Sequence, residues 1–169
     1  MKRGIAGTGL ALIACLAIVS LADAQQKASG GVPNLEGTWI ATHRELPDGE
    51  TVKPPHIVGL LTFRDGYRNF NLMWKDSNGN PFSISAISRF TISDTAYTEE
   101  SVYFMASDGS SGEPPMYDVS GQKGSSPITK DGNAYTWKMP LFNEPSLTVE
   151  GDKIIAHGDG FVDHWTRVK

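Results

Sequence analysis

The chain has 169 residues, a single cysteine and a formal net charge of −4 at pH 7. Because an acidic chain without a basic run repels phosphate groups, we expect no nucleic-acid partner. The length fits one domain behind a leader segment, and the single cysteine excludes a framework of disulfides within the chain.

The first 24 residues have the three parts of a secretory signal peptide. A basic start at residues 1–3 precedes an apolar run over residues 10–21, and Ala22-Asp23-Ala24 supplies small residues before Gln25. We therefore predict a signal peptide over 1–24, a short polar tether over 25–33 and an exported protein, periplasmic or secreted. The apolar run is shorter than the roughly 20 residues that a membrane span needs, so no span is expected. Cys15 leaves one alternative, in which the exported protein is lipid-anchored through this residue.

From residue 34 onwards, short segments of alternating or wholly apolar residues are separated by turn residues such as Asp65-Gly66. We expect strands over 38–46, 57–63, 67–75, 82–92, 95–106, 135–139, 146–149, 153–157 and 161–168. Hairpin spacing without helical periodicity predicts an all-β domain over 34–169. The expected architecture is an antiparallel up-and-down barrel of eight to nine strands, with a sandwich as the alternative. The Gly-, Ser- and Pro-rich segment 107–126 is expected to form either a disordered insertion or a lid over the barrel mouth.

Sequence motifs at the two ends of this domain carry a resemblance to a known family. Gly37-Thr38-Trp39 opens the first expected strand, and Trp165-Thr166-Arg167 closes the last one. Between them stand Phe90-Thr91-Ile92 and Tyr97-Thr98-Glu99. In this order, over residues 37–169, the motifs resemble those of bacterial secreted lipocalin-like domains of the calycin superfamily.

The resemblance implies a barrel and a pocket, but no established reaction. It implies that the Arg167 guanidinium lies over the Trp39 indole and joins the first and last strands. A cation over an indole stabilises a fold and is no evidence of catalysis. The structural signature implied in this way consists of Gly37, Trp39, Trp165 and Arg167.

The strand expected from Thr95 carries a row of polar and aromatic residues, which a period of two places on one face. The row consists of Tyr97, Glu99, Ser101, Tyr103 and Met105. If this face lines the barrel lumen, it can hold the polar end of a ligand, and burial would raise the pKa of Glu99. The alternative is that Glu99 faces solvent and Val102 and Phe104 form the core. The ligand-binding residues predicted from the first interpretation are Asn69, Asn71, Phe90, Tyr97, Glu99 and Tyr103.

No metal site, cofactor site or catalytic motif is predicted. The four histidines are spread along the chain without a close His-x-His pair, and turn formation explains the residues around His157 and Asp159. Asp76 begins a stretch with three calcium-loop oxygens in register, but Pro81 stands where glycine is needed and Ile87 where a bidentate Glu is needed. Nucleophile-elbow, phosphate-loop and dinucleotide motifs do not occur in the sequence.

Three functions are consistent with these observations. The first is binding of a small hydrophobic or amphipathic molecule in the barrel lumen, oriented by Tyr97, Glu99 and Tyr103. The second is an enzyme of isomerase or cyclase type, in which Glu99 or a tyrosine transfers a proton. The third is a structural or interaction module whose lumen is filled by side chains. A ligand-sized lumen of about 300 Å³ or more would favour the first two over the third.

Overall fold

The computed structural model of the protein describes residues 31–169. The predicted signal peptide 1–24, Cys15 and most of the tether lie outside the described residues. The described part is all-β, with one antiparallel sheet of thirteen strands. Within it, no helix is long and apolar enough to cross a membrane. The strands are β1 Gly37–Glu45, β2 Thr51–Val52, β3 Ile57–Arg64, β4 Tyr67–Lys75, β5 Pro81–Ile92, β6 Ala96–Asp108, β7 Met116–Asp118, β8 Lys123–Pro127, β9 Thr129–Asp131, β10 Ala134–Lys138, β11 Ser146–Glu150, β12 Lys153–Gly158 and β13 Phe161–Arg167.

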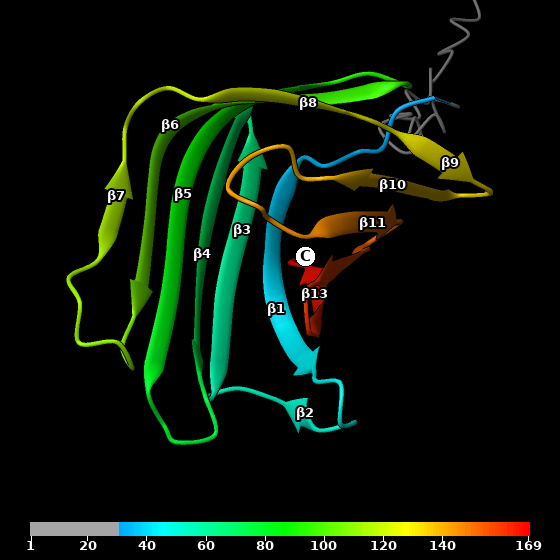
Figure 1. The fold of residues 1–169 in the computed structure, drawn as a ribbon. Coiled ribbons are helices and arrows are strands. Elements are labelled where there is room, and N and C mark those ends of the chain that lie inside the picture. Colours follow the sequence, from blue (N-terminus) through cyan, green and yellow to red (C-terminus); the bar gives the residue numbers. More distant parts are fainter. Residues whose placement is uncertain (1–30) are drawn as a thin grey trace, which may run out of the picture.

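The sheet is strongly curved around an interior (Figure 1). Its strand order is β7-β6-β5-β4-β3-β1-β13-β12-β11-β10-β9, so most neighbours follow one another in the sequence. The pairing of β1 with β13 joins the two ends of the domain. The hydrogen-bonded path has two free ends and is not closed, so the expected barrel is not confirmed. Only Ile128 separates β8, which pairs with β6, from β9, which pairs with β10.

All nine expected segments form strands, and the count is higher than the expected eight to nine because four short strands are added. The additional strands are β2, β7, β8 and β9. Two of them, β7 and β8, come from the Gly-, Ser- and Pro-rich segment 107–126. This segment runs back along β6 as an edge of the sheet and is neither a separate lid nor a featureless insertion.

The concave face of the sheet carries the hydrophobic core, because successive side chains of a strand point to opposite faces. On β4, the side chains of Arg68 and Leu72 are buried, while Asn69 and Asn71 are exposed on the other face. The largest side chains that are almost completely buried belong to Trp39, Trp137, Tyr97 and Phe63.

Trp39 and Arg167 join the first and last strands at one end of the domain. They are paired residues of β1 and β13, and the Arg167 guanidinium carbon lies 4.0 Å from the centroid of the Trp39 ring. The Trp39 indole N–H donates to the carbonyl oxygen of Leu35, while Arg167 donates to the carbonyl oxygens of Asn34 and Glu36. The contact that the lipocalin-like resemblance implied is therefore present.

Two β-bulges change which side chains face the interior. The first lies at Thr42 in β1, where the pairing with β13 shifts between Ala41 and His43. The second lies at Val102 in β6, where the pairing with β5 shifts between Ile87 and Ser88. An extra residue in one strand reverses the inward and outward positions beyond it. The first bulge thus changes which face Arg44 occupies, and the second changes which face Tyr103 occupies.

Candidate functional site

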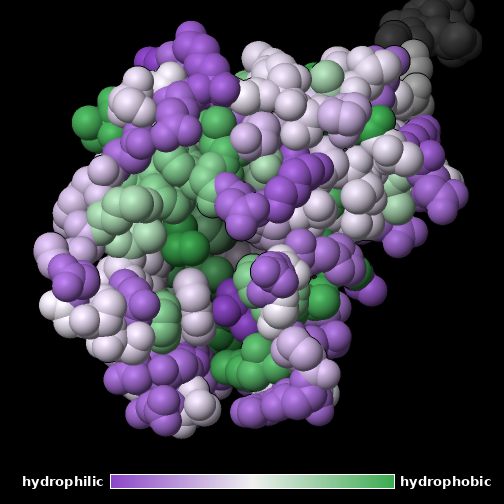
Figure 2. Space-filling view, viewed as in Figure 1, coloured by the Kyte–Doolittle hydropathy of each residue, from purple (hydrophilic) through white to green (hydrophobic). Residues whose placement is uncertain are grey.

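A cavity of about 160 Å³ lies within the curved sheet. Its wall is mostly apolar and includes Leu61, Leu72, Ile154, Ala156 and Trp165. Figure 2 shows the molecule hollowed near the centre of this view, with hydrophobic residues around the hollow. The volume is below the roughly 300–1,000 Å³ of typical drug-sized pockets, but an apolar cavity of about 150 Å³ is known to hold benzene. The cavity therefore does not reach the roughly 300 Å³ expected of a ligand-sized lumen, and it suits at most a molecule of about one ring.

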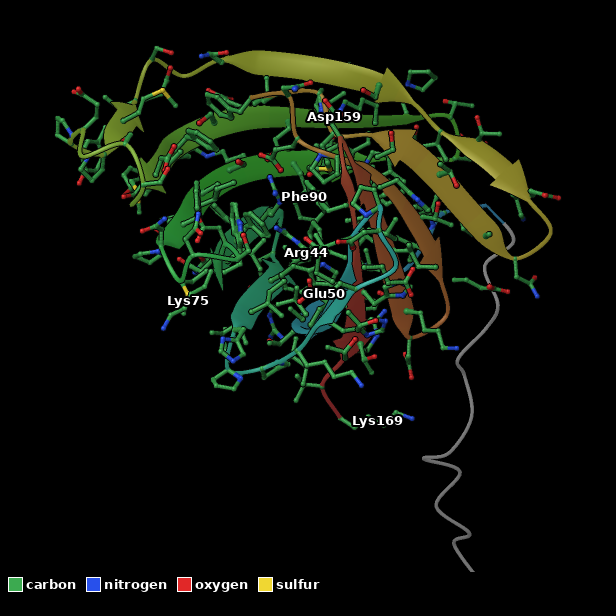
Figure 3. The ribbon with its side chains drawn as sticks, turned by 60° about the horizontal axis from the view of Figure 1, so that its bottom comes forward. Arg44, Glu50, Lys75, Phe90, Asp159 and Lys169 are labelled. Atoms are coloured by element: carbon green, nitrogen blue, oxygen red, sulfur yellow. The ribbon has the colours of Figure 1, made fainter. Side chains whose placement is uncertain are left out.

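Arg44 reaches the cavity wall from β1 as half of a buried ion pair. Its Nε and Nη2 donate to the two carboxylate oxygens of Asp163, at 2.6 and 2.8 Å. The guanidinium carbon also lies 4.5 Å from the Trp74 ring centroid and 4.1 Å from that of Phe161. Figure 3 shows Arg44 in the interior, whereas Lys75 and Lys169 lie at the periphery. The paired register after the Thr42 bulge places Arg44 directly opposite Asp163.

Arg68 reaches the same cavity from β4 and contacts two buried carboxylates. Its Nη1 donates to Glu99 Oε1 at 2.8 Å and to Glu144 Oε1 at 3.2 Å, and its Nη2 donates to Glu144 Oε2. All three side chains are at most 7% exposed. The cluster thus has one cation against two carboxyl groups, and burial of an unbalanced charge is costly.

Burial and charge shift the pKa values in this cluster. Burial lowers the pKa of Arg68, but the carboxylates of Glu144 and Glu99 outweigh this effect and raise it above its ordinary value. Burial raises the pKa of the Glu144 carboxyl, although Arg68 acts in the opposite direction. Burial also raises the pKa of Tyr97 well above its usual value, with a further contribution from Glu99. Arg68 therefore stays cationic and Tyr97 stays a neutral phenol, while Glu144 holds its proton to a higher pH than an exposed glutamate.

Four buried polar atoms around Arg68 have no hydrogen-bond partner among the described residues. They are Arg68 Nε, Tyr97 Oη, Glu99 Oε2 and Ser101 Oγ. Buried polar atoms are normally paired, and an exception calls for an explanation such as bound water or a ligand. Of these four residues, only Arg68 lines the cavity, and the other three lie behind its wall.

The loop between β10 and β11 brings Glu144 to the cavity. Figure 1 shows this loop projecting from β10 towards the β3 side of the sheet. Phe142 and Asn143 have positive φ angles of 51° and 52°, in the left-handed region that a bulky side chain seldom adopts. The Phe142 ring stacks on Phe104 with centroids 4.0 Å apart, which holds the loop against β6. Backbone strain of this kind often occurs at functional sites.

The structure separates the predicted ligand-binding residues into two groups. Tyr97 and Glu99 are buried on the inner face, with Glu99 contacting Arg68. Phe90 packs between Phe63 and Tyr97 in the core and does not line the cavity. Tyr103 lies on the opposite face from Glu99, because the bulge at Val102 reverses the alternation, and its ring contacts the exposed Tyr117.

Asn69 and Asn71 lie on the outer face of β4, and the Asn71 amide donates to Asn69 Oδ1 at 2.9 Å. Neither amide reaches the inner cavity.

Models of known protein families, curated protein sequences and solved structures give no match to this chain. No family model or relative therefore assigns a reaction or a ligand to these residues.

The four charged residues at the cavity were missed in the sequence. Arg68 stands in the same alternation as Phe70, Leu72 and Trp74 and therefore on the apolar face of its strand. A charged residue on that face could have indicated a buried, functional arginine. Asp163 stands likewise in register with Trp165. Arg44 could not be found in this way because the Thr42 bulge changes its face, and Glu144 could not because it lies in a loop. The charged residues that line the cavity are Arg44, Arg68, Glu144 and Asp163.

Proposed function

We propose that this chain is an exported lipocalin-like protein that binds a small, largely apolar molecule with a neutral polar group inside its sheet. The observation that carries the proposal is the mostly apolar cavity of about 160 Å³ beside the incompletely partnered Arg68 cluster. Export is supported by the sequence pattern of residues 1–24.

The lipocalin-like architecture is part of this proposal. It is supported by the Arg167–Trp39 contact and by the nearly consecutive β8 and β9, which pair with β6 and β10 respectively. Residues 123–131 thereby connect the two ends of the sheet around the interior. In this interpretation the fold is a barrel whose seam is made by one crossing segment and not by a continuous ladder.

The charges near the cavity support one class of ligand. Arg44 is neutralised by Asp163, whereas Arg68 faces both Glu99 and Glu144, so the five groups carry an excess of carboxyl over guanidinium. A ligand carboxylate or phosphate would add another negative group to this surplus. A hydroxyl or amide can instead donate to a carboxylate and accept from Arg68. We therefore infer a neutral ligand with one polar end.

The experiment compares three probes of nearly the same size on the exported protein: benzyl alcohol, toluene and benzoate. Binding is followed by the chemical shifts of Trp74 and Trp165, which line the cavity. Benzyl alcohol should bind most tightly, toluene more weakly and benzoate least, because only the alcohol combines an apolar ring with a neutral hydrogen-bonding group. Binding of benzoate as tight as that of benzyl alcohol would contradict the proposed ligand class.

A cavity-filling variant tests the location. Ala156→Leu adds three carbon atoms at a lining position and should abolish benzyl alcohol binding. Ile155→Phe adds volume at the next position of β12, which does not line the cavity, and should leave binding unchanged. If none of the probes binds and native mass spectrometry of the protein from its host reveals no retained molecule, the filled structural module is the better explanation.

A second candidate function is proton transfer of the isomerase or cyclase type. It is favoured by Glu144, which lines the cavity and has a raised pKa caused by burial. A buried carboxyl group with a raised pKa holds its proton to a higher pH, which makes it a candidate acid or base. This candidate requires turnover of a bound ligand, and loss of that turnover in Glu144→Gln with binding retained would distinguish it from simple binding.

A further inference from the structure

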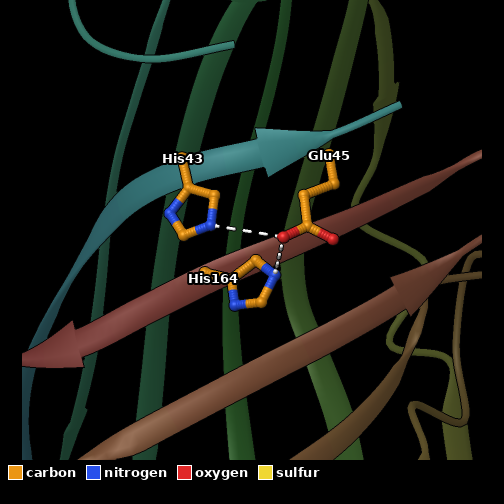
Figure 4. Close-up of side chains that lie close together, drawn as sticks. All are labelled: His43, Glu45 and His164. Atoms are coloured by element: carbon orange, nitrogen blue, oxygen red, sulfur yellow. Dashed lines mark ion pairs between the residues drawn. The ribbon is translucent and has the colours of Figure 1, made fainter. Parts of the chain in front are cut away.

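The outer face of β1 and β13 carries a cluster of two histidines and one glutamate (Figure 4). Glu45 Oε1 lies 3.6 Å from His43 Nε2 and 3.3 Å from His164 Nε2. One ligand atom from each residue lies within 4.8 Å of the others. The cluster is on the opposite side of the sheet from the Arg44–Asp163 pair, so it is independent of the inner cavity.

The β-bulge at Thr42 creates this cluster. It shifts the register so that His43 pairs directly with His164, while the next residues, Arg44 and Asp163, pair on the inner face. Glu45 follows His43 by two residues and therefore projects to the same side. Bulges often re-aim side chains beside functional sites. The sequence did not reveal the pair, since the two histidines are far apart in the chain.

Thr42 also fixes the proton on the His43 ring. Its hydroxyl donates to the carbonyl oxygen of His164 at 3.0 Å, so its single proton is engaged. Its oxygen lies 3.0 Å from His43 Nδ1 and must accept a proton from that nitrogen. The lone pair of a neutral His43 is then on Nε2, the atom that faces Glu45. Fixing a histidine tautomer through its other nitrogen is typical of metal ligands.

His164 supplies a second available nitrogen. Its Nε2 is shielded from solvent and has no hydrogen-bond partner among the described residues, although it lies 3.3 Å from Glu45 Oε1. The side chains of His43, His164 and Glu45 are 29%, 26% and 52% exposed, so an ion from solution can reach the cluster.

We propose that His43, Glu45 and His164 form a binding site for a divalent ion of the Zn²⁺ class. Zinc binds histidine nitrogen and carboxylate oxygen at about 2.0–2.2 Å, so two ligands of a tetrahedral site are about 3.3 Å apart. The two nitrogen-to-oxygen distances are close to this value. The histidine rings stack in parallel with centroids 4.2 Å apart, so binding requires both rings to tilt towards the ion. Three protein ligands leave the remaining position open to solvent, and the ion would connect the first and last strands.

The test is a calorimetric titration of the folded protein with Zn²⁺, with Ca²⁺ as the comparison ion. We expect one Zn²⁺ per chain and no Ca²⁺ binding, because calcium requires a larger set of oxygen ligands. His43→Gln and His164→Gln should each weaken Zn²⁺ binding at least tenfold. His56→Gln is the matched control, since His56 is exposed and outside the cluster, and it should bind as the unmodified protein does.

Two further variants keep the test decisive if a histidine variant fails to fold. Glu45→Gln changes an exposed side chain and should also weaken binding at least tenfold. Thr42→Val removes the hydroxyl that fixes the His43 tautomer and donates to the His164 carbonyl oxygen, and should weaken binding about tenfold. Absence of stoichiometric Zn²⁺ binding, or equal binding by the folded His164→Gln or Glu45→Gln variant, would overturn the proposal.

Discussion

Arg44 and Arg68 lie on the wall of one cavity, but their charges are balanced in different ways. Arg44 is paired with one carboxylate through two short hydrogen bonds and lies between two aromatic rings. Arg68 contacts two carboxyl groups, and its Nε has no partner among the described residues. The first arrangement is electrically balanced, and the second is not.

This difference separates structural from functional use of a buried charge. The Arg44–Asp163 pair joins β1 to β13, and both carboxylate oxygens of Asp163 accept hydrogen bonds from Arg44. The Arg68 cluster has buried polar atoms without partners among the described residues, and burial raises the pKa of its second carboxyl group, Glu144. We therefore expect substitutions at the first to affect mainly folding, and substitutions at the second to affect ligand binding and pH dependence.

The largest expected effect comes from breaking the balanced pair. Asp163→Leu leaves the Arg44 cation buried without its carboxylate and should lower the free energy of unfolding by about 3–5 kcal/mol. Urea titration measures this loss. The double variant Arg44→Met with Asp163→Leu removes both charges and should recover most of the stability, because a matched apolar pair replaces the ion pair. If the double variant were no more stable than Asp163→Leu, the stability lost in Asp163→Leu would not come from the unpaired Arg44 charge.

Another arginine that lies over an aromatic ring, Arg167, provides a reference outside the cavity. Its guanidinium is partly solvated and lies over Trp39, so Arg167→Ala should cost roughly 1–2 kcal/mol, less than Asp163→Leu. Trp39→Ala removes a fully buried ring and should cost about 3–5 kcal/mol. Since the two side chains touch, the loss in the double variant should be smaller than the sum of the single losses. Strict additivity in urea titrations would contradict their coupling.

The sequence predicted the main strands well because local alternation and turn residues specify them. All nine expected segments are strands, and the contact between Trp39 and Arg167 is present. The open hydrogen-bonded path was not predictable from these local signals. It depends on how residues 123–131 pair with β6 and β10, and these pairings join segments whose own sequences are short and polar.

The candidate site was predicted only in part, for a specific geometric reason. A strict period of two correctly places Tyr97, Glu99 and Ser101 on one face, but it fails at Tyr103 because Val102 is an extra residue. The bulge at Thr42 hides the pairing of Arg44 with Asp163 in the same way. Nothing in the local pattern of a strand reveals where one residue will be unpaired, so single-residue bulges limit the prediction of which side chains meet.

The loop that carries Glu144 allows a smaller perturbation of the Arg68 cluster. Asn143 has a φ of 52°, in the left-handed region that alanine disfavours and glycine tolerates. Asn143→Ala should therefore be about 1 kcal/mol less stable than Asn143→Gly. Asp65→Ala is the matched control, because Asp65 has a φ of 51° in an exposed turn. Both alanine variants should lose similar stability, but only Asn143→Ala should also weaken benzyl alcohol binding. If Asn143→Ala and Asp65→Ala changed benzyl alcohol binding equally, the conformation of this loop would have no specific influence on the cavity.

The smallest expected effect, a pH dependence, tests the unbalanced charge most directly. Burial raises the pKa of Glu144 above its ordinary 4.5, so the folded protein binds this proton more tightly than the unfolded chain does. The resulting stabilisation is complete below pH 4.5 and is lost as the pH rises through the raised value. Glu144→Gln cannot ionise, so its stability relative to the unmodified protein should increase between pH 4.5 and 8, as measured by urea titrations across this range.

Asp76 gives the opposite sign and serves as the control for that measurement. Its hydrogen bond from the Asn80 side chain, with further backbone donors, lowers its pKa below 3.8, so its stabilising effect is present above that pH and is lost in acid. Asp76→Asn should therefore differ from the unmodified protein by a constant amount between pH 5 and 8. If Glu144→Gln behaves like Asp76→Asn over this range, Glu144 is ionised throughout. The Arg68 cluster would then carry its second negative charge at neutral pH, and its contrast with the balanced Arg44 pair could not rest on a retained proton.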